Sequence, residues 1–261
     1  MRAEPLPGYG LPRGSRRHAA HLYGSGGPGS VSDGGSRTVE DAAKKLRCKA
    51  FLFDLDGVLV DSRSIVERTW RQWAERHQID PAPFLQIAHG RRALDTLRMV
   101  LPRLATDTEV EWLDATELAD REGLKPVPGA RELVASLPRH RWAIVTSCGR
   151  DLARLRLGSA GIPIPDVMMV AEEVKRGKPA PDGYRLGAER LGYAPPACIV
   201  FEDAPAGVAA GRAAGARVVG LTTTHAAADL SGVDATIADF RGIDIRPELD
   251  AFVVTFPSMT P

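Results

Sequence analysis

The chain alternates between short apolar runs and stretches in which apolar residues recur at helical spacing. Runs that are apolar throughout are typical of strands in a parallel sheet covered on both faces. Predicted strands cover residues 48–55, 142–146, 167–170, 198–201, 217–221 and 235–237; predicted helices between them cover residues 130–137, 152–157, 182–191 and 206–214. This alternation predicts an α/β fold with a Rossmann-like parallel sheet core.

One segment interrupts the alternation. Residues 63–125 contain helical stretches at 65–76, 93–100 and 109–121, and no convincing strand. They predict a small helical cap domain inserted after the first strand. Two linkers flank it, at residues 61–63 and 123–128, and the second is rich in Gly and Pro. We expect the cap to open and close over the end of the first strand.

The rest of the chain divides around this insertion. The predicted core comprises residues 46–62 and 126–245, followed by a C-terminal tail at 246–261. Residues 1–45 are rich in Gly, Pro, Ser and Arg and show no periodic apolar pattern, which predicts a disordered basic tail. This tail lacks the apolar centre of a secretory signal.

Composition and charge exclude several function classes. The 261 residues are 44% hydrophobic with a formal net charge of +1, so nothing global favours binding to nucleic acid or an anionic membrane. No apolar run is long enough to span a bilayer. Three cysteines stand far apart without metal-like spacing, which fits a reducing compartment, and we expect a cytoplasmic protein.

The first predicted strand ends in two carboxylates, Asp54 and Asp56, followed by Gly57. Residues two apart on a strand point to the same side, and glycine permits a sharp turn. Two like charges this close need a cation, a shared proton or both. The alternative is a strand that ends in an ordinary polar turn.

Further polar residues follow the later strands. These are Thr146 and Ser147, which open a helix, Lys178 in a loop, and the pair Glu202 and Asp203. Taken one at a time, each of these residues can be interpreted as a helix cap or as a solvated charge. Together, at the carboxyl edge of one sheet, the acids form an oxygen cage for Mg²⁺ and the helix start forms a phosphate seat. A carboxylate can then attack phosphorus while a second transfers protons.

Over about residues 48–240 the chain resembles the haloacid dehalogenase superfamily. The resemblance rests on DLDGVL at 54–59, Thr146-Ser147, KPAPD at 178–182 and EDAPAG at 202–207. It implies a nucleophile at Asp54, a general acid/base at Asp56, and phosphate and nucleophile partners at Thr146 and Lys178. The implied Mg²⁺ ligands are Asp54, the main-chain carbonyl of Asp56, Glu202 and Asp203.

The helical insertion resembles the cap of the β-phosphoglucomutase-like branch. Within that branch the chain is most similar to phosphatases of small sugar and polyol phosphates, such as 2-deoxyglucose-6-phosphate, hexitol phosphates and glycerol-3-phosphate. The residues that carry this are DS at 61–62, Val66-Glu67, Trp70, HGR at 89–91 and WAIVTS at 142–147. The resemblance implies a Mg²⁺-dependent phosphatase that acts on small phosphate esters, and we expect a monomer.

Rival functions remain open. A sugar phosphomutase of this branch uses a cap histidine where this chain has Val66, so water is the expected acceptor. A phosphonatase needs a cap lysine, and none precedes Lys125 within the insertion. A dehalogenase lacks the second aspartate, whereas this chain has Asp56. A non-catalytic sugar-phosphate sensor would bind without turnover.

The cap loop His89-Gly90-Arg91 lies between helices where the cap would meet the core. We expect these residues, with Ser147, to contact substrate, because donors there suit hydroxyl groups; the alternative is a solvated surface loop. Cys148 departs from the family, which usually has a small residue there. A thiol at a helix N-terminus beside a phosphate seat prompts the hypothesis of a lowered pKa and ready oxidation; the alternative is an inert small residue.

Overall fold

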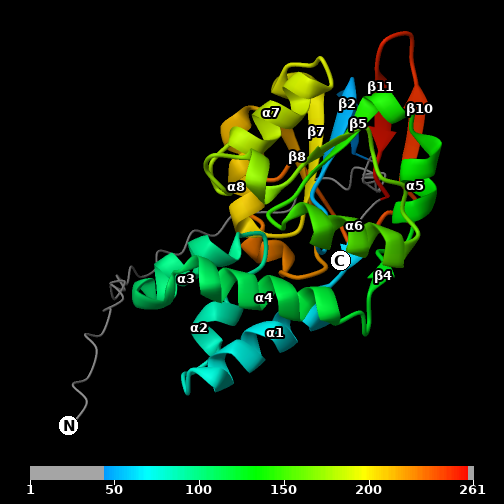
Figure 1. Ribbon diagram of the computed structural model, residues 1–261. Coiled ribbons are helices and arrows are strands. Elements are labelled where there is room, and N and C mark those ends of the chain that lie inside the picture. Colours follow the sequence, from blue (N-terminus) through cyan, green and yellow to red (C-terminus); the bar gives the residue numbers. More distant parts are fainter. Residues whose placement is uncertain (1–43, 258–261) are drawn as a thin grey trace, which may run out of the picture. The chain divides into compact units, whose positions relative to one another are not determined.

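The computed structural model describes residues 44–257 (Figure 1). Its centre is a parallel sheet of six strands in the order β6-β5-β2-β7-β8-β9, and each pair is in parallel register. These strands are β2 (Ala50–Phe53), β5 (Trp142–Val145), β6 (Val167–Met169), β7 (Cys198–Glu202), β8 (Arg217–Leu221) and β9 (Ala235–Ile237). The predicted α/β fold is confirmed.

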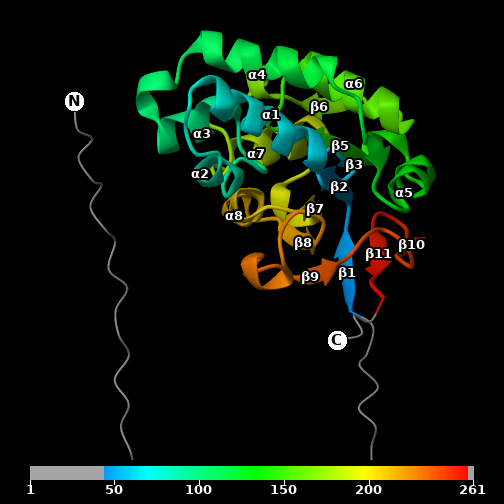
Figure 2. The same ribbon diagram turned by 90° about the horizontal axis from the view of Figure 1, so that it is seen from below.

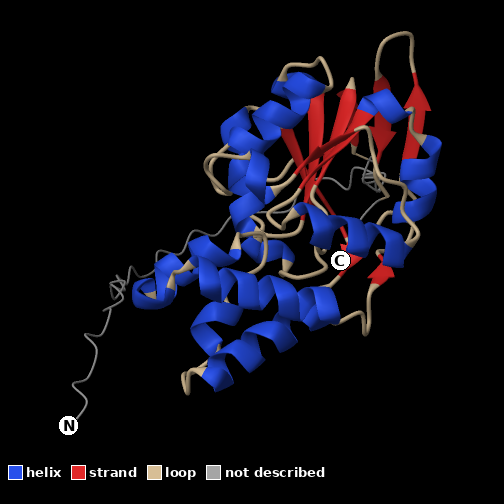
Figure 3. Cartoon of the chain, in the orientation of Figure 1, coloured by secondary structure: helices blue, strands red, loops and turns tan. Residues whose placement is uncertain are grey.

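Both faces of the sheet are covered by helices, as the continuous apolar strands predicted (Figures 1 and 3). Phe51 and Phe53 of β2 join an apolar cluster that includes residues of α5 (Ala130–Ser136) and α6 (Arg150–Ala160). Ala50 and Leu52 point to the other face, where they join residues of α7 (Asp182–Arg190) and α8 (Pro205–Ala214). Full burial of one such large side chain contributes about 1.5–3 kcal/mol. Helices on both faces thus hold β2 at the centre of the sheet.

The insertion after β2 is helical, as predicted. It contains α1 (Arg63–Arg76), α2 (Ala82–Leu85), α3 (Ala93–Val100) and α4 (Asp107–Ala119). The short helix α2 was not predicted. The cap has an apolar cluster of its own, formed by Trp70, Trp73, Phe84, Ala88, Leu97 and Leu113. This separate cluster gives the cap an interior that does not depend on the sheet.

The two predicted linkers lie side by side and pair with each other. Strand β3 (Val60–Asp61) runs antiparallel to β4 (Lys125–Pro126). An ion pair of 3.3 Å between Lys125 Nζ and Asp61 Oδ2 joins them. The cap is therefore attached to the core through a paired ribbon rather than through two independent loops.

A second, antiparallel sheet lies beside the main one (Figure 2). It pairs β11 (Phe252–Thr255) with both β1 (Lys45–Cys48) and β10 (Asp244–Pro247). The run predicted as one strand at residues 48–55 is thus broken at Lys49, whose N–H bonds the Ala197 carbonyl. The predicted C-terminal tail, residues 246–261, includes strand β11, because Phe252 and Val254 bury their side chains against the core.

The predicted disordered tail at residues 1–45 lies outside the described residues, except for Lys44 and Lys45. Within residues 44–257, no helix combines the length and the apolar character needed to cross a lipid bilayer.

Candidate active site

Asp54 stands at the carboxyl end of the central strand β2. Its N–H continues the sheet by donating to the Phe201 carbonyl at 3.0 Å, and its side chain is almost fully buried. The turn that follows depends on Gly57, which has φ +74° and whose N–H bonds the Val60 carbonyl at 2.7 Å. A Cβ at Gly57 would lie 2.0 Å from Asp203 Oδ2. Glycine therefore allows both the turn and the close approach of Asp203.

Lys178 joins two of the predicted carboxylates. Its Nζ lies 2.5 Å from Asp54 Oδ1 and 2.6 Å from Glu202 Oε1, and all three side chains are buried. Burial alone would disfavour the ammonium charge, but the carboxylates of Asp54 and Glu202 outweigh burial and raise the Lys178 pKa above its ordinary value. Lys178 therefore stays charged beside the carboxylate of Asp54.

Asp54, Glu202 and Asp203 form a buried carboxylate cluster, with one oxygen from each lying within 4.8 Å of the others. At such distances two like charges repel by about 3.5 kcal/mol at an effective dielectric constant near 20. Burial raises the Asp54 pKa to about 7, opposed by Lys178 and reinforced by Glu202. Burial, then Glu202 and Asp54, likewise raise the Asp203 pKa well above its ordinary value.

The cluster suits a metal ion. Lys178 supplies one positive charge against three carboxylates, so the ionised cluster keeps an excess of negative charge. Asp203 Oδ1 is buried and has no hydrogen-bond partner within residues 44–257. A hard divalent cation bound by carboxylate oxygens would satisfy that atom and relieve the repulsion.

The Asp56 side chain has partners outside this cluster. Ser62 donates to its Oδ1 at 2.6 Å, and Arg156 Nη1 donates to its Oδ2 at 2.5 Å. Its side chain thus lies apart from the cluster of Asp54, Glu202 and Asp203, which leaves the main-chain carbonyl of Asp56 as the predicted ligand atom.

Thr146 and Ser147 follow β5, directly before α6. The Thr146 hydroxyl accepts from the Cys148 N–H at 3.2 Å and lies 3.2 Å from the Cys148 Sγ. Ser147 Oγ donates to the Gly90 carbonyl at 3.0 Å, so Ser147 contacts the cap loop directly. Burial, followed by the charge of Asp56, raises the Cys148 pKa to about 12. The hypothesis of a lowered pKa is therefore wrong, because desolvation of the thiolate exceeds any stabilisation by the helix start.

The predicted cap residues meet the core carboxylates at one cavity of about 70 Å³. Gly90 has φ +75°, and a Cβ there would lie 2.7 Å from the Ala204 Cβ of the core. Burial, and then the nearby His225, lower the His89 pKa, so the His89 ring is neutral near pH 7. Among the predicted site residues, those lining the cavity are Asp54, Asp56, His89, Gly90, Arg91 and Ser147.

Three contacts at this site were not predicted. The Tyr184 hydroxyl of α7 donates to Glu202 Oε1 at 2.5 Å, and the Thr224 hydroxyl donates to Asp203 Oδ2 at 2.5 Å. Arg156 of α6 contacts Asp56. Tyr184 and Arg156 lie inside helices, and Thr224 lies three residues after β8. The sequence signal that could have identified two of them is a polar side chain on the buried face of α6 or α7. That signal does not identify the residue to which the side chain bonds.

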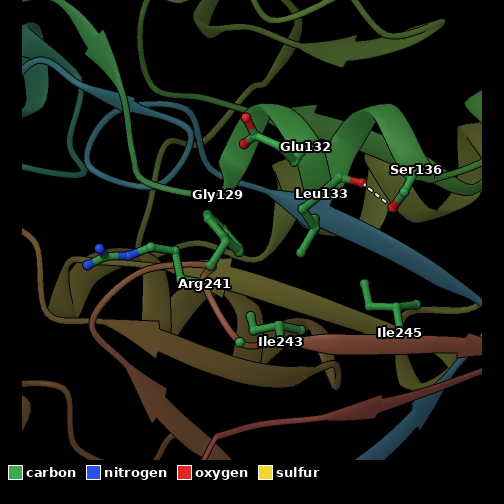
Figure 4. A pocket seen from close by; sticks show the side chains of 9 residues that line it. Gly129, Glu132, Leu133, Ser136, Arg241, Ile243 and Ile245 are labelled. Carbon is green, nitrogen blue, oxygen red and sulfur yellow. Dashed lines mark hydrogen bonds between the residues drawn. The ribbon is translucent and has the colours of Figure 1, made fainter.

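A larger depression lies between α5 and β10 (Figure 4). Its volume is about 590 Å³, and Leu133, Ile243 and Ile245 supply much of its wall. Ser136 Oγ is already bonded to the Leu133 carbonyl at 2.7 Å. Arg241 is paired with Asp239 at 2.6 Å. This depression gathers none of the predicted site residues, so size alone does not mark the reactive site.

A family model described as haloacid dehalogenase-like hydrolase matches residues 48–215. The chain belongs to this family. This haloacid dehalogenase-like hydrolase is 43% identical to hexitol phosphatase A of Escherichia coli (strain K12), over 80% of this chain and 99% of that protein. It is 36% identical to glycerol-1-phosphate phosphohydrolase 2 of Saccharomyces cerevisiae, over 69% of this chain and 76% of that protein.

A solved structure of a hydrolase from Pseudomonas syringae has the same fold as this hydrolase. Its TM-score is 0.65 at 28% identity, with 74% of this chain and 94% of that chain covered. The resemblance to the haloacid dehalogenase superfamily, inferred from four motifs, is confirmed.

Proposed function

We propose that this hydrolase is a Mg²⁺-dependent phosphatase of small sugar or polyol phosphate monoesters, and that Asp54 carries the phosphoryl group as an aspartyl-phosphate. The observation that carries the proposal is the position of Asp54. Its carboxylate belongs to the buried carboxylate cluster and also lines the cavity beneath the cap. Asp54 can therefore reach the phosphorus of an ester bound in the cavity, while its carboxylate would also help to hold a metal ion.

In the first half-reaction an Asp54 carboxylate oxygen attacks phosphorus, and the bond between phosphorus and the ester oxygen breaks. Asp56, which lines the same cavity, gives its proton to the departing oxygen, so the product leaves as a neutral alcohol. Lys178, at 2.5 Å from Asp54, offsets negative charge on the nucleophile and the phosphate. Thr146, together with N–H groups at the start of α6, is the proposed seat for the phosphate.

In the second half-reaction Asp56 takes a proton from water, and the oxygen of that water attacks phosphorus. The bond to Asp54 breaks, which restores its carboxylate and releases inorganic phosphate. Asp54, Glu202, Asp203 and the main-chain carbonyl of Asp56 are the proposed ligands of Mg²⁺, which supplies charge stabilisation for the transferring phosphoryl group.

The proposed substrate class rests on the cap and on the relatives. Hexitol phosphatase A and glycerol-1-phosphate phosphohydrolase 2 are named for polyol phosphates. The cap side of the cavity supplies His89 and Arg91, whose donors suit hydroxyl groups. The cavity of about 70 Å³ is far smaller than the ~300–1,000 Å³ of typical ligand pockets, so substrate entry requires the cap to move.

A sugar phosphomutase is the second candidate within this chemistry. It would need a group to activate a sugar hydroxyl instead of water. Val66 lines the cavity at the position where the resembled phosphomutases have a cap histidine, and an aliphatic side chain accepts no proton. Val66 therefore supports water as the acceptor.

The test is phosphate release from a panel of esters, measured with Mg²⁺ and with excess chelator. The panel contains hexose-6-phosphates, 2-deoxyglucose-6-phosphate, hexitol phosphates, glycerol phosphates and β-glucose-1-phosphate. We expect metal-dependent release that is highest on one sugar or polyol ester. Conversion of β-glucose-1-phosphate to the 6-phosphate without release would favour the mutase. Binding of these esters with no reaction of any kind would favour a non-catalytic sensor.

A further inference from the structure

A chain of ion pairs centred on a buried arginine joins the cap to the core at the active site. Arg156 lies on α6 of the core, with its side chain only 3% exposed. One end of its guanidinium donates to Asp56 Oδ2 at 2.5 Å, and the other end donates to the Glu117 carboxylate of cap helix α4. Glu117 is also shielded, with its side chain 13% exposed. Arg156 is thus shared between a cap carboxylate and the proposed acid/base.

The geometry of this bridge restricts Asp56. Its two carboxylate oxygens are held from two directions, by Ser62 at 2.6 Å and by Arg156 at 2.5 Å. The guanidinium is planar, so its contact with Glu117 on one side fixes the direction of its N–H groups on the other. If α4 moves away with the cap, the Arg156 contact to Glu117 breaks and the orientation of the guanidinium is no longer fixed.

We infer that Arg156 is a positioning residue that orients Asp56 for proton transfer only while Glu117 of the cap is in place. This inference rests on the proposed function, because it concerns the same acid/base. Opening the cap to admit substrate releases one end of Arg156, and closing the cap restores the aligned carboxylate. Proton transfer is thereby confined to the closed state, in which the cavity excludes bulk water.

The test compares kcat and KM for the best ester of the panel in full-length variants. Arg156→Met preserves length but removes both contacts, and we expect kcat to fall on the order of 100-fold with KM within about threefold, as for a misplaced catalytic group. The kcat of Arg156→Lys should be at least about tenfold higher than that of Arg156→Met, because lysine retains one charged contact. Glu117→Gln should lower kcat on the order of tenfold while the Arg156 contact to Asp56 remains.

Coupling between the two ends of the bridge is measured with the double variant Arg156→Met/Glu117→Gln. Its kcat should lie within about twofold of the kcat of Arg156→Met alone, because both changes break the same chain of contacts. The control is Arg68→Met, which removes an arginine bonded to Asp120 at 2.7 Å in the same cap without touching Asp56. Its kcat should stay within about twofold of the wild type.

Several results would overturn the inference. Wild-type kcat in Arg156→Met would show that Asp56 needs no such support, and a higher kcat would show that the bridge holds Asp56 away from its task. A raised KM with unchanged kcat would make Arg156 a substrate contact instead. If the kcat losses of the two single variants multiply in the double variant, Glu117 and Arg156 act independently, which contradicts the inference. Thermal melting of each variant identifies loss of folded protein, and an inactive wild type would instead contradict the proposed function.

Discussion

At the scale of single residues, the proposed metal site depends on how the Asp203 carboxylate is held. Asp203 Oδ2 accepts from the Thr224 hydroxyl at 2.5 Å, while its Oδ1 has no hydrogen-bond partner in the described part of the chain. Thr224 therefore fixes the rotation of the Asp203 carboxylate and aims Oδ1 at the proposed metal position. Side chains that orient metal ligands in this way typically account for about 10–100-fold of metal affinity.

Thr224→Val removes this hydroxyl but keeps the size of the side chain. We expect the Mg²⁺ concentration needed for half-maximal activity to rise about 10–100-fold, with a small change in KM for the ester. Titration of activity with Mg²⁺ measures this. Thr224→Ser keeps the donor and is the matched control. Equal Mg²⁺ dependence in wild type and Thr224→Val would show that Thr224 does not orient the ligand.

The sequence predicted those site residues that lie in short local motifs. Asp54 and Asp56 come within three residues after β2, Glu202 is the last residue of β7 and Asp203 follows it, so the order of the sheet determines where they meet. Tyr184, Arg156 and Thr224 were missed because their partners are 18, 100 and 21 residues away, respectively. Such partners are set by how helices and loops pack on the sheet, which no local pattern specifies.

At the scale of elements, helix α8 is placed so that its first turn lies against Glu202. A Cβ at Gly207 would lie 1.8 Å from Glu202 Oε1, which leaves no room for any side chain. Glycine is otherwise a poor helix former. Gly207 therefore allows α8 to pack beside a carboxylate that is also held by Lys178 and Tyr184.

Gly207→Ala should displace Glu202 or α8. We expect a loss of stability of about 1–3 kcal/mol, as for other overpacked sites, and a strong loss of activity. Gly158→Ala on α6 is the matched control, because a Cβ there would meet no atom within 4 Å. That change should stabilise the protein by about 0.5–1 kcal/mol through helix propensity. Denaturant unfolding of both variants measures the difference, and equal effects would contradict the packing argument.

Element prediction succeeded where apolar strands and helices alternate along the chain, and it failed for elements outside that alternation. The six parallel strands and the helices α5 to α8 were predicted, with ends that differ by a few residues. The four-residue helix α2 was missed because it offers little more than one turn of pattern. The strand β11 was missed because it follows the region in which strands and helices alternate. Strand β11 also depends on pairing with β1, which is about 200 residues away in the chain.

At the scale of the whole molecule, the buried carboxylates make stability depend on pH and on metal. Burial raises the pKa of Asp54 from 3.8 to about 7, and burial likewise raises the pKa of Glu117 from 4.5 to about 7. A carboxyl with a raised pKa stabilises the fold fully below its unfolded pKa. That contribution is lost as the pH rises through the folded value.

Metal-free protein should therefore melt at progressively lower temperature between about pH 4 and about pH 7, the unfolded and folded pKa values of these carboxyls. Carboxyls with lowered pKa values, such as Asp120, change stability only at more acidic pH. Mg²⁺ binds the ionised cluster, so it should restore most of the loss at the upper end of this range, by about 2.7 kcal/mol at a hundredfold excess over its Kd. Calorimetry in chelator and in Mg²⁺ measures both. A melting temperature that rises with pH in chelator would contradict the raised pKa values of Asp54 and Glu117.

The central claim is that the Asp54 carboxylate accepts the phosphoryl group, and phosphate release by Asp54→Asn tests it most directly. The amide cannot form an acyl phosphate, so kcat should fall by at least about 10³-fold on the best ester. The same change removes one charge from the carboxylate cluster, so metal-free Asp54→Asn should melt no lower than the wild type near pH 8, which separates lost chemistry from lost folding. Phosphate release by folded Asp54→Asn at the wild-type rate would contradict the account.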